Sequence, residues 1–229
     1  MKSKPTIHTV LFDLDGTLAD TAPDLTYCLN LLRDKHNLPE LSLNTVRPAV
    51  SHGAAALIEL GFEINSENSR FEPLYTNLLD LYLENIAVKT NLFEGMKELL
   101  DNIESKCMNW GIVTNKPKRF TDPLVEKLGI ATRASCVISG DSIEYKKPHP
   151  MPINLACQLS GSVPSQCVYV GDAKRDIIAG KAAGTKTLVA LFGYIHSVDR
   201  PSEWGADGSV NKPLEIMDWI NEHSASTKF

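Results

Sequence analysis

Two aspartates, Asp13 and Asp15, stand directly after the apolar residues 10–12 and before Gly16 and Thr17. An uninterrupted apolar run is typical of a strand buried in a sheet, so we expect the two carboxylates where that strand ends. A carboxylate can attack an electrophile, carry a proton or bind a hard cation. The stretch therefore predicts a charged centre rather than an ordinary surface turn.

Three further polar clusters follow later apolar runs of the chain. In an open parallel sheet the ligand crevice lies beyond the carboxyl ends of the strands, so the clusters are expected to converge there. Taken singly, each has an ordinary alternative as a helix cap or a solvated loop charge. Their joint placement favours a shared site. The clusters are Thr114 with Asn115 and Lys116, Lys146 with Lys147 and Pro148, and Gly171 with Asp172 and Asp176.

The predicted convergence of carboxylates requires a cation. Two like charges about 4 Å apart repel by roughly 4 kcal/mol at an effective dielectric constant of 20. Oxygen-only ligands suit Mg²⁺, with Asp13 and Asp172 as the direct carboxylates. A calcium-binding EF-hand loop is disfavoured, because its sixth position needs glycine and Leu18 stands there. Lys147 and Thr114 would supply donors to an anion beside the metal, and phosphate suits that mixture.

The elements that must position these residues alternate along the chain. Apolar runs predict strands at residues 9–12, 110–113, 136–138, 168–170 and 187–191. Helical patterns lie between the later runs, at residues 96–103, 118–128, 152–159 and 173–183. This alternation predicts an α/β fold with a parallel sheet.

Residues 21–89 interrupt the alternation with helical patterns, and we predict a helical insert there. Residues 46–62 are predicted to form a loop followed by a helix. The two ends of the insert, near Asp20 and residues 90–93, are candidate hinges, so the insert is expected to close over the strand ends as a lid. The predicted division is a core of residues 1–20 and 90–229 and a cap of residues 21–89.

Composition excludes several other classes of protein. The 229 residues are 43% hydrophobic, which is enough for a full core, and the net charge of −5 gives no basic field for nucleic acid. No run approaches the roughly 20 apolar residues of a membrane span. The five scattered cysteines are typical of reduced thiols. We expect a soluble cytoplasmic protein that acts on a small phosphorylated metabolite, without a nucleic-acid or membrane partner and with its oligomeric state left open.

Together these motifs resemble those of the haloacid dehalogenase superfamily phosphatases, in order and in spacing. The resemblance implies a Rossmann-like core with a helical cap inserted after the first strand. It also implies that Asp13 forms an aspartyl-phosphate and that Asp15 acts as general acid and base. Further roles that it implies are phosphate binding by Thr114, Asn115 and Lys147, and a Mg²⁺ site built from Asp13, the backbone carbonyl of Asp15 and Asp172, with Asp176 supporting it from behind.

The predicted cap is expected to select the substrate, because the sheet recognises only phosphate. Arg47, Ser51 and His52 are candidates to face the metal, and a guanidinium suits a carboxylate or sugar oxygens. An alternative is that Ser51 only caps a helix.

The chain is similar overall to the phosphoglycolate phosphatase group. The stretches RPAVSHGA, WGIVTNKP, KKPHP, VYVGDAKRDI, FGYI and WGADG look more like phosphatases of N-acetylmuramic acid 6-phosphate. N-Acetylmuramic acid 6-phosphate is therefore the predicted substrate, with 2-phosphoglycolate as the alternative. A sugar phosphomutase is a second alternative, and a receiver-like phosphoacceptor switch is the alternative from a different class.

Overall fold

The structure, a computed structural model, describes residues 6–223 and contains one six-stranded sheet in which every neighbouring pair is parallel. This confirms the α/β fold with a parallel sheet. The strands, in spatial order, are β5 (Val137–Ile138), β4 (Asn109–Val113), β1 (Thr9–Phe12), β6 (Cys167–Gly171), β7 (Lys186–Ala190) and β8 (Gly208–Val210).

Strand β1 lies in the middle of the sheet and fixes where the polar clusters meet. Phe12 pairs with Ile112 of β4 on one side and with Val170 of β6 on the other. All three strands run in the same direction, so the residues that follow them emerge at one edge of the sheet. This register places the segments after residues 12, 113 and 171 beside one another.

Helices cover both faces of the sheet, which explains why β1 is apolar along its whole length. Successive side chains of a strand point to opposite faces. Val10 and Phe12 belong to the larger core, and Leu11 belongs to a second core with Ile153. The covering helices are α5 (Met96–Ser105) and α9 (Glu215–His223), which contact each other, α7 (Met151–Leu159) and α8 (Lys174–Ala183), which also contact each other, and α6 (Lys118–Lys127) after β4.

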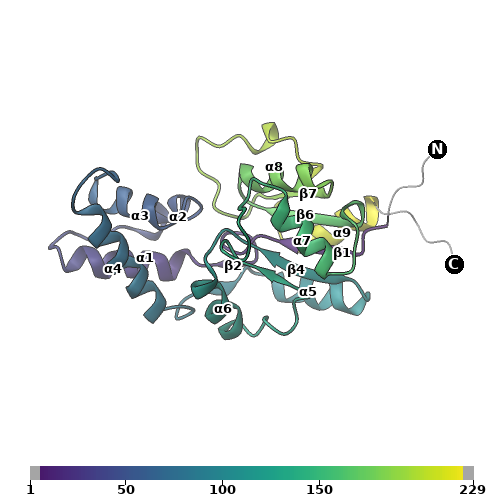
Figure 1. The fold of residues 1–229 in the computed structure, drawn as a ribbon, viewed down its shortest axis with the longest axis horizontal. Coiled ribbons are helices and arrows are strands. Elements are labelled where there is room, and N and C mark those ends of the chain that lie inside the picture. Colours follow the sequence, from purple (N-terminus) through teal and green to yellow (C-terminus); the bar gives the residue numbers. More distant parts are fainter. Residues whose placement is uncertain (1–5, 224–229) are drawn as a thin grey trace.

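Four helices inserted between β1 and β4 form a separate group beside the sheet (Figure 1). The chain enters and leaves this group through a two-stranded antiparallel ribbon of β2 (Ala19–Asp20) and β3 (Asn91–Leu92). Asp24 strengthens the ribbon, because its carboxylate accepts hydrogen bonds from the backbone N–H of Lys89 at 2.6 Å and from the hydroxyl of Thr90 at 2.5 Å. The helices are α1 (Ala22–Asp34), α2 (Leu43–Val50), α3 (Gly53–Phe62) and α4 (Phe71–Glu84).

The predicted loop in the middle of the insert is wrong, because residues 43–50 form helix α2 despite Pro48 within it. Ser42 explains where this helix begins, since its hydroxyl accepts a hydrogen bond from the backbone N–H of Thr45 at 3.2 Å. The break between α2 and α3 falls at Ser51 and His52, where Ser51 ends α2. The alternative in which Ser51 caps the following helix is therefore also wrong, because His52 occupies that position.

All five cysteines are free thiols, as the sequence predicts. Among residues 6–223, no helix is long and apolar enough to cross a membrane.

Candidate active site

Asp13 is buried at the end of β1, and one of its two carboxylate oxygens is fully engaged by the protein. Oδ1 accepts hydrogen bonds from the backbone N–H of Leu14 at 2.7 Å and from Nζ of Lys147 at 2.8 Å. No residue in the described range 6–223 donates to Oδ2, and Asp13 lines a cavity. The carboxylate is thus held by one oxygen and presents the other, as a nucleophile requires.

Lys147 is tightly constrained, because its ammonium lies within 2.8 Å of three side-chain oxygens, although its contact with Asp176 is an ion pair without hydrogen-bond geometry. Its Nζ contacts Oδ1 of Asp13 at 2.8 Å, Oδ1 of Asp176 at 2.8 Å and the hydroxyl of Tyr169 at 2.7 Å. The Tyr169 hydroxyl in turn donates to the carbonyl of Val113 at 2.8 Å. The ammonium is therefore fixed beside Asp13 by partners at the end of β1, in β6 and in α8.

Three buried carboxylates, those of Asp13, Asp172 and Asp176, offer oxygen atoms that all lie within 4.8 Å of one another. Burial, together with the neighbouring charges of Asp13 and Asp176, raises the pKa of Asp172 to about 7. Burial also raises the pKa of Asp13, although Lys147 opposes the change. A single lysine does not neutralise this cluster, and a hard divalent cation held by oxygen ligands fits it.

Asp172 is held in place by main-chain and hydroxyl donors from three parts of the chain. Its Oδ2 accepts from the backbone N–H of Tyr194 at 2.8 Å and from the hydroxyl of Ser51 at 3.3 Å, and its Oδ1 accepts from the hydroxyl of Thr17 at 3.4 Å. Gly16 allows this packing, because it has φ +85° and a Cβ there would lie 2.1 Å from Oδ2 of Asp172. The end of α2 therefore reaches the acidic cluster through Ser51.

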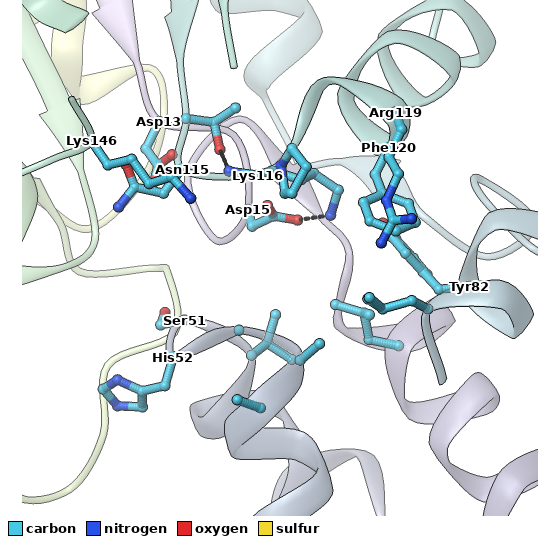
Figure 2. Close-up of a pocket in the computed structure, with 18 of the residues that line it drawn as sticks. Asp13, Asp15, Ser51, His52, Tyr82, Asn115, Lys116, Arg119, Phe120 and Lys146 are labelled. Carbon is cyan, nitrogen blue, oxygen red and sulfur yellow. Dashed lines mark hydrogen bonds and ion pairs between the residues drawn. The ribbon is translucent and has the colours of Figure 1, made fainter. Parts of the chain in front are cut away.

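Asp15 faces the cavity and is bound by a different lysine. Its Oδ1 accepts a hydrogen bond from the hydroxyl of Thr21 at 2.6 Å and forms an ion pair with Nζ of Lys116 at 2.9 Å (Figure 2). Lys116 also lies over the ring of Tyr82, at 4.5 Å from its centroid. Burial disfavours the charged form of Lys116, but the charges of Asp15 and Tyr82, with the hydrogen bond that the ammonium donates to Asp15, together outweigh burial and raise the pKa of the lysine.

Thr114 and Asn115 both lie at the cavity, after β4. The hydroxyl of Thr114 accepts from the backbone N–H of Lys116 at 3.1 Å, which leaves its own proton available to a ligand. The side chain of Asn115 exchanges two hydrogen bonds with the backbone of Lys147, at 2.9 and 3.0 Å. Neither residue caps α6, whose N-cap is Pro117. Asn115 therefore fixes the loop that carries the buried lysine.

The cavity has a volume of about 510 Å³ and lies between the sheet edge and the helical insert. Ser51 and His52 line it on the side of the insert, opposite Asp13 and Asp15 (Figure 2). Arg47 is placed differently, since its guanidinium forms a double hydrogen bond with the carboxylate of Asp20 at 2.8 and 2.9 Å. Arg47 is not among the residues that line the cavity.

Several residues that shape this cavity have no predicted role in the sequence analysis. Arg175 lies near the acidic cluster, where burial disfavours its charge but the carboxylates of Asp176 and Asp13 raise its pKa. Lys116, Arg119 and Lys146 also line the cavity. Lys116 and Lys146 belong to the polar clusters predicted to converge here, and each stands beside a predicted phosphate ligand, but neither has a role of its own in that prediction. Arg119 lies within a helix, outside these clusters, and no signal in the sequence marks it.

Comparison with known proteins agrees with this geometry. Residues 10–190 match the family model described as haloacid dehalogenase-like hydrolase. The chain is 42% identical to an N-acetylmuramic acid 6-phosphate phosphatase of Pseudomonas aeruginosa, over 94% of this chain and 95% of that protein. It is 38% identical to a phosphoglycolate phosphatase of Xanthomonas campestris, over 92% and 95%.

Among solved structures, a predicted phosphoglycolate phosphatase from Haemophilus somnus superposes with a TM-score of 0.81 at 28% identity, covering 93% of this chain and 97% of that one. The chain therefore belongs to the haloacid dehalogenase-like hydrolase family, in the branch whose relatives are named as phosphatases.

Proposed function

We propose that the protein is a Mg²⁺-dependent phosphomonoester hydrolase that acts on N-acetylmuramic acid 6-phosphate through an aspartyl-phosphate on Asp13. The observation that carries the proposal is the arrangement around Asp13. One carboxylate oxygen is pinned by Lys147 at 2.8 Å, while the other is free of protein partners among residues 6–223 and belongs to a side chain that lines the cavity.

The donor set at the sheet edge supports Mg²⁺ as the cofactor. Asp13 and Asp172 would hold it, together with the backbone carbonyl of Asp15. Both carboxylate oxygens of Asp176 already have partners, since Oδ1 lies 2.8 Å from Lys147 and Oδ2 accepts from the backbone N–H of Ala173 at 3.0 Å. This supports a role for Asp176 in positioning Lys147 and the loop before α8, rather than in binding the metal directly. When bound, Mg²⁺ would neutralise negative charge on the transferring phosphoryl group.

The chain's own residues divide the reaction between them. An oxygen of Asp13 attacks phosphorus and the bond from phosphorus to the ester oxygen breaks, while Asp15 gives that oxygen a proton. Water then attacks the aspartyl-phosphate, and Asp15 takes a proton from the water as Asp13 and inorganic phosphate are released. Thr114 and Lys147 donate to the phosphoryl oxygens, and Asn115 keeps the backbone of Lys147 in place.

The four-helix insert would act as the cap in this reaction. We take residues 21–89 as this cap and residues 1–20 and 90–229 as the core. Ser51 and His52 would face the substrate from the cap, since both line the cavity, and Ser51 reaches Asp172. Closing over the cavity would exclude water from the attacking carboxylate.

The size of the cavity favours an amino-sugar phosphate over 2-phosphoglycolate. About 510 Å³ falls within the range of pockets that enclose drug-sized ligands, roughly 300–1,000 Å³. Phosphoglycolate is a two-carbon acid and would fill little of it. It is kept as the second candidate because a 38% identical relative is named for it. The phosphatase names of relatives matched over nine tenths of the chain favour hydrolysis over a phosphoacceptor switch.

A steady-state comparison tests the proposal. With Mg²⁺, the purified protein is expected to show a higher kcat/KM for N-acetylmuramic acid 6-phosphate than for 2-phosphoglycolate or glucose 6-phosphate. EDTA should abolish activity and excess Mg²⁺ should restore it. Asp13→Asn should abolish hydrolysis of p-nitrophenyl phosphate while the circular dichroism spectrum is retained. Turnover by that variant would remove Asp13 from its role, and activity that needs a sugar bisphosphate would indicate a mutase.

A further inference from the structure

The cavity carries a guanidinium that has no carboxylate partner. Arg119 lies in the first turn of α6 and lines the cavity, and its side chain extends towards Tyr82 in Figure 2. Among residues 6–223, no carboxylate is within ion-pair distance of it, whereas its neighbour Lys118 pairs with Asp122 at 3.0 Å. The guanidinium lies over the ring of Phe120, 4.5 Å from the centroid, which limits its freedom.

A continuous wall of side chains leads from the proposed general acid to Arg119. Lys116 is ion-paired with Asp15 at 2.9 Å and lies 4.5 Å from the ring centroid of Tyr82. The ring of Tyr82 is 5.6 Å from that of Phe120, on which Arg119 rests. Asp15 protonates the leaving oxygen, so the leaving group begins at Asp15 and extends along this wall.

We propose that Arg119 binds a carboxylate on the leaving group and thereby selects the substrate. The inference rests on the proposed function and deepens it. N-Acetylmuramic acid 6-phosphate carries a lactyl carboxylate through the ether oxygen on C3, whereas its phosphate is attached through C6 to C5, so the two groups are separated by C4 of the ring. With phosphorus at Asp13, a sugar that extends along the wall would bring its lactyl carboxylate to Arg119, where the planar guanidinium can bind both oxygens.

The other cations that line the cavity are less suited to this role. Lys116 is already paired with Asp15. Arg175 lies near the carboxylates of Asp13, Asp172 and Asp176, and their negative charges would repel the carboxylate of a substrate. Lys146 adjoins Lys147, the proposed phosphate ligand, and lies on the other side of Asp13 from Arg119 in Figure 2.

The test uses two sugar phosphates that differ only in the lactyl ether, N-acetylmuramic acid 6-phosphate and N-acetylglucosamine 6-phosphate. The measured quantity is the ratio of their kcat/KM values. We expect wild type to prefer the muramic compound and Arg119→Met to lower that ratio by about 10- to 100-fold, as loss of a charge-assisted bidentate contact predicts. Arg119→Lys should retain part of the preference, because an ammonium keeps the positive charge but lacks the paired N–H donors that bind both carboxylate oxygens.

Lys118→Met is the matched control, since it removes one positive charge from the adjacent residue outside the cavity and should leave the ratio unchanged. An unchanged ratio in Arg119→Met, or a collapse of the ratio in Lys146→Met instead, would overturn the assignment to Arg119 while the substrate assignment stands. Wild type that hydrolyses p-nitrophenyl phosphate but does not prefer the muramic compound would overturn the proposed substrate, and this inference with it. Activity of Arg119→Met on p-nitrophenyl phosphate shows that the variant is folded.

Discussion

The ammonium of Lys116 lies 2.9 Å from Oδ1 of Asp15, in an ion pair whose side chains are only 8% and 19% exposed. Thr21 donates to the same oxygen at 2.6 Å, so Oδ1 is occupied and Oδ2 is the oxygen left to handle protons. Because the pair is largely shielded from water, it orients the carboxylate more firmly than a surface ion pair does. Lys116 is therefore a positioning residue for the proposed general acid.

Replacing Lys116 by methionine should impair proton delivery to the leaving group. General acid catalysis contributes about 10²- to 10⁴-fold, and loss of its orientation should lower kcat/KM for an alkyl phosphate by about 10- to 100-fold. The loss on p-nitrophenyl phosphate should be smaller, since that leaving group needs little protonation. Lys97→Met is the control, because Lys97 forms an ion pair of the same length with Asp101 on the exposed face of α5. Equal losses on both esters would contradict the positioning role.

Asp172→Asn should have opposite effects on thermal stability without and with Mg²⁺. Burial and the charges of Asp13 and Asp176 raise the pKa of Asp172 to about 7, so at pH 8 its ionised form opposes folding of the metal-free protein. We expect the variant without Mg²⁺ to melt higher than wild type, by about 2–4 °C for each kcal/mol of repulsion relieved. Mg²⁺ should raise the Tm of wild type but not of the variant.

Differential scanning calorimetry with and without EDTA measures these shifts. Asp80→Asn, an exposed position on α4, controls for the loss of one negative charge. A variant that gains as much Tm from Mg²⁺ as wild type would remove Asp172 from the metal site.

Arg47 links the insert to the ribbon rather than to the cavity in the observed arrangement. Its two hydrogen bonds to Asp20 are joined by one from the Tyr194 hydroxyl at 2.8 Å. We expect Arg47→Met to lower kcat/KM for the muramic substrate and for p-nitrophenyl phosphate by the same factor, because it would loosen the insert for both. Asp20→Asn should reproduce the effect. A loss confined to the muramic substrate would instead place Arg47 on the substrate, as predicted from the sequence.

Asp207 offers a stability prediction remote from the site. Its carboxylate binds Nζ of Lys186 at 2.6 Å and the backbone N–H of Thr187 at 2.9 Å. Burial opposes its ionisation, but these donors outweigh burial and lower its pKa below 3.8. Asp207→Ala should reduce the free energy of unfolding by about 1–3 kcal/mol at pH 7.

The pH dependence of that difference follows from the lowered pKa of Asp207 in the folded protein. The stabilisation is present above pH 3.8 and is lost as the pH falls through the folded-state pKa. Urea unfolding at pH 7, 5 and 3 measures the difference between wild type and variant. A difference that is equal at all three pH values would contradict the ionic origin of the effect.

The sequence predicts the sheet and the meeting of polar clusters because both follow from local patterns. Asp13 and Asp172 each follow an apolar run, and the shared direction of parallel strands brings them together. Helix α2 is not predicted from the sequence, because a proline inside a helix is unfavourable and Pro48 lies within this one, although Ser42 is a suitable N-cap. Strand β8 is not predicted either, because its three residues are too few to show an alternation of apolar and polar side chains.

Local patterns predict that the polar clusters converge, but they do not predict which individual side chains from distant segments contact each other. Nothing in the order of residues shows that Lys116 meets Asp15 or that Ser51 reaches Asp172, since each pair is joined only when the insert folds against the sheet or the strands align. The guanidinium of Arg119 likewise becomes notable only once the cavity and its unpaired charge are visible.

The ribbon of β2 and β3 makes the insert an exchangeable module. Because the chain departs from the sheet and rejoins it through paired neighbouring strands, a transplant of residues 21–89 from a relative would meet the chain at one short junction. It would also need to preserve contacts across the cavity, such as that of Ser51 with Asp172. Such a chimaera would inherit the recipient's Arg119 and the donor's counterparts of Ser51 and His52. With the proposed roles of Arg119, Ser51 and His52, substrate preference would be a joint property of both parts, and re-engineering it would require changes on either side of the junction.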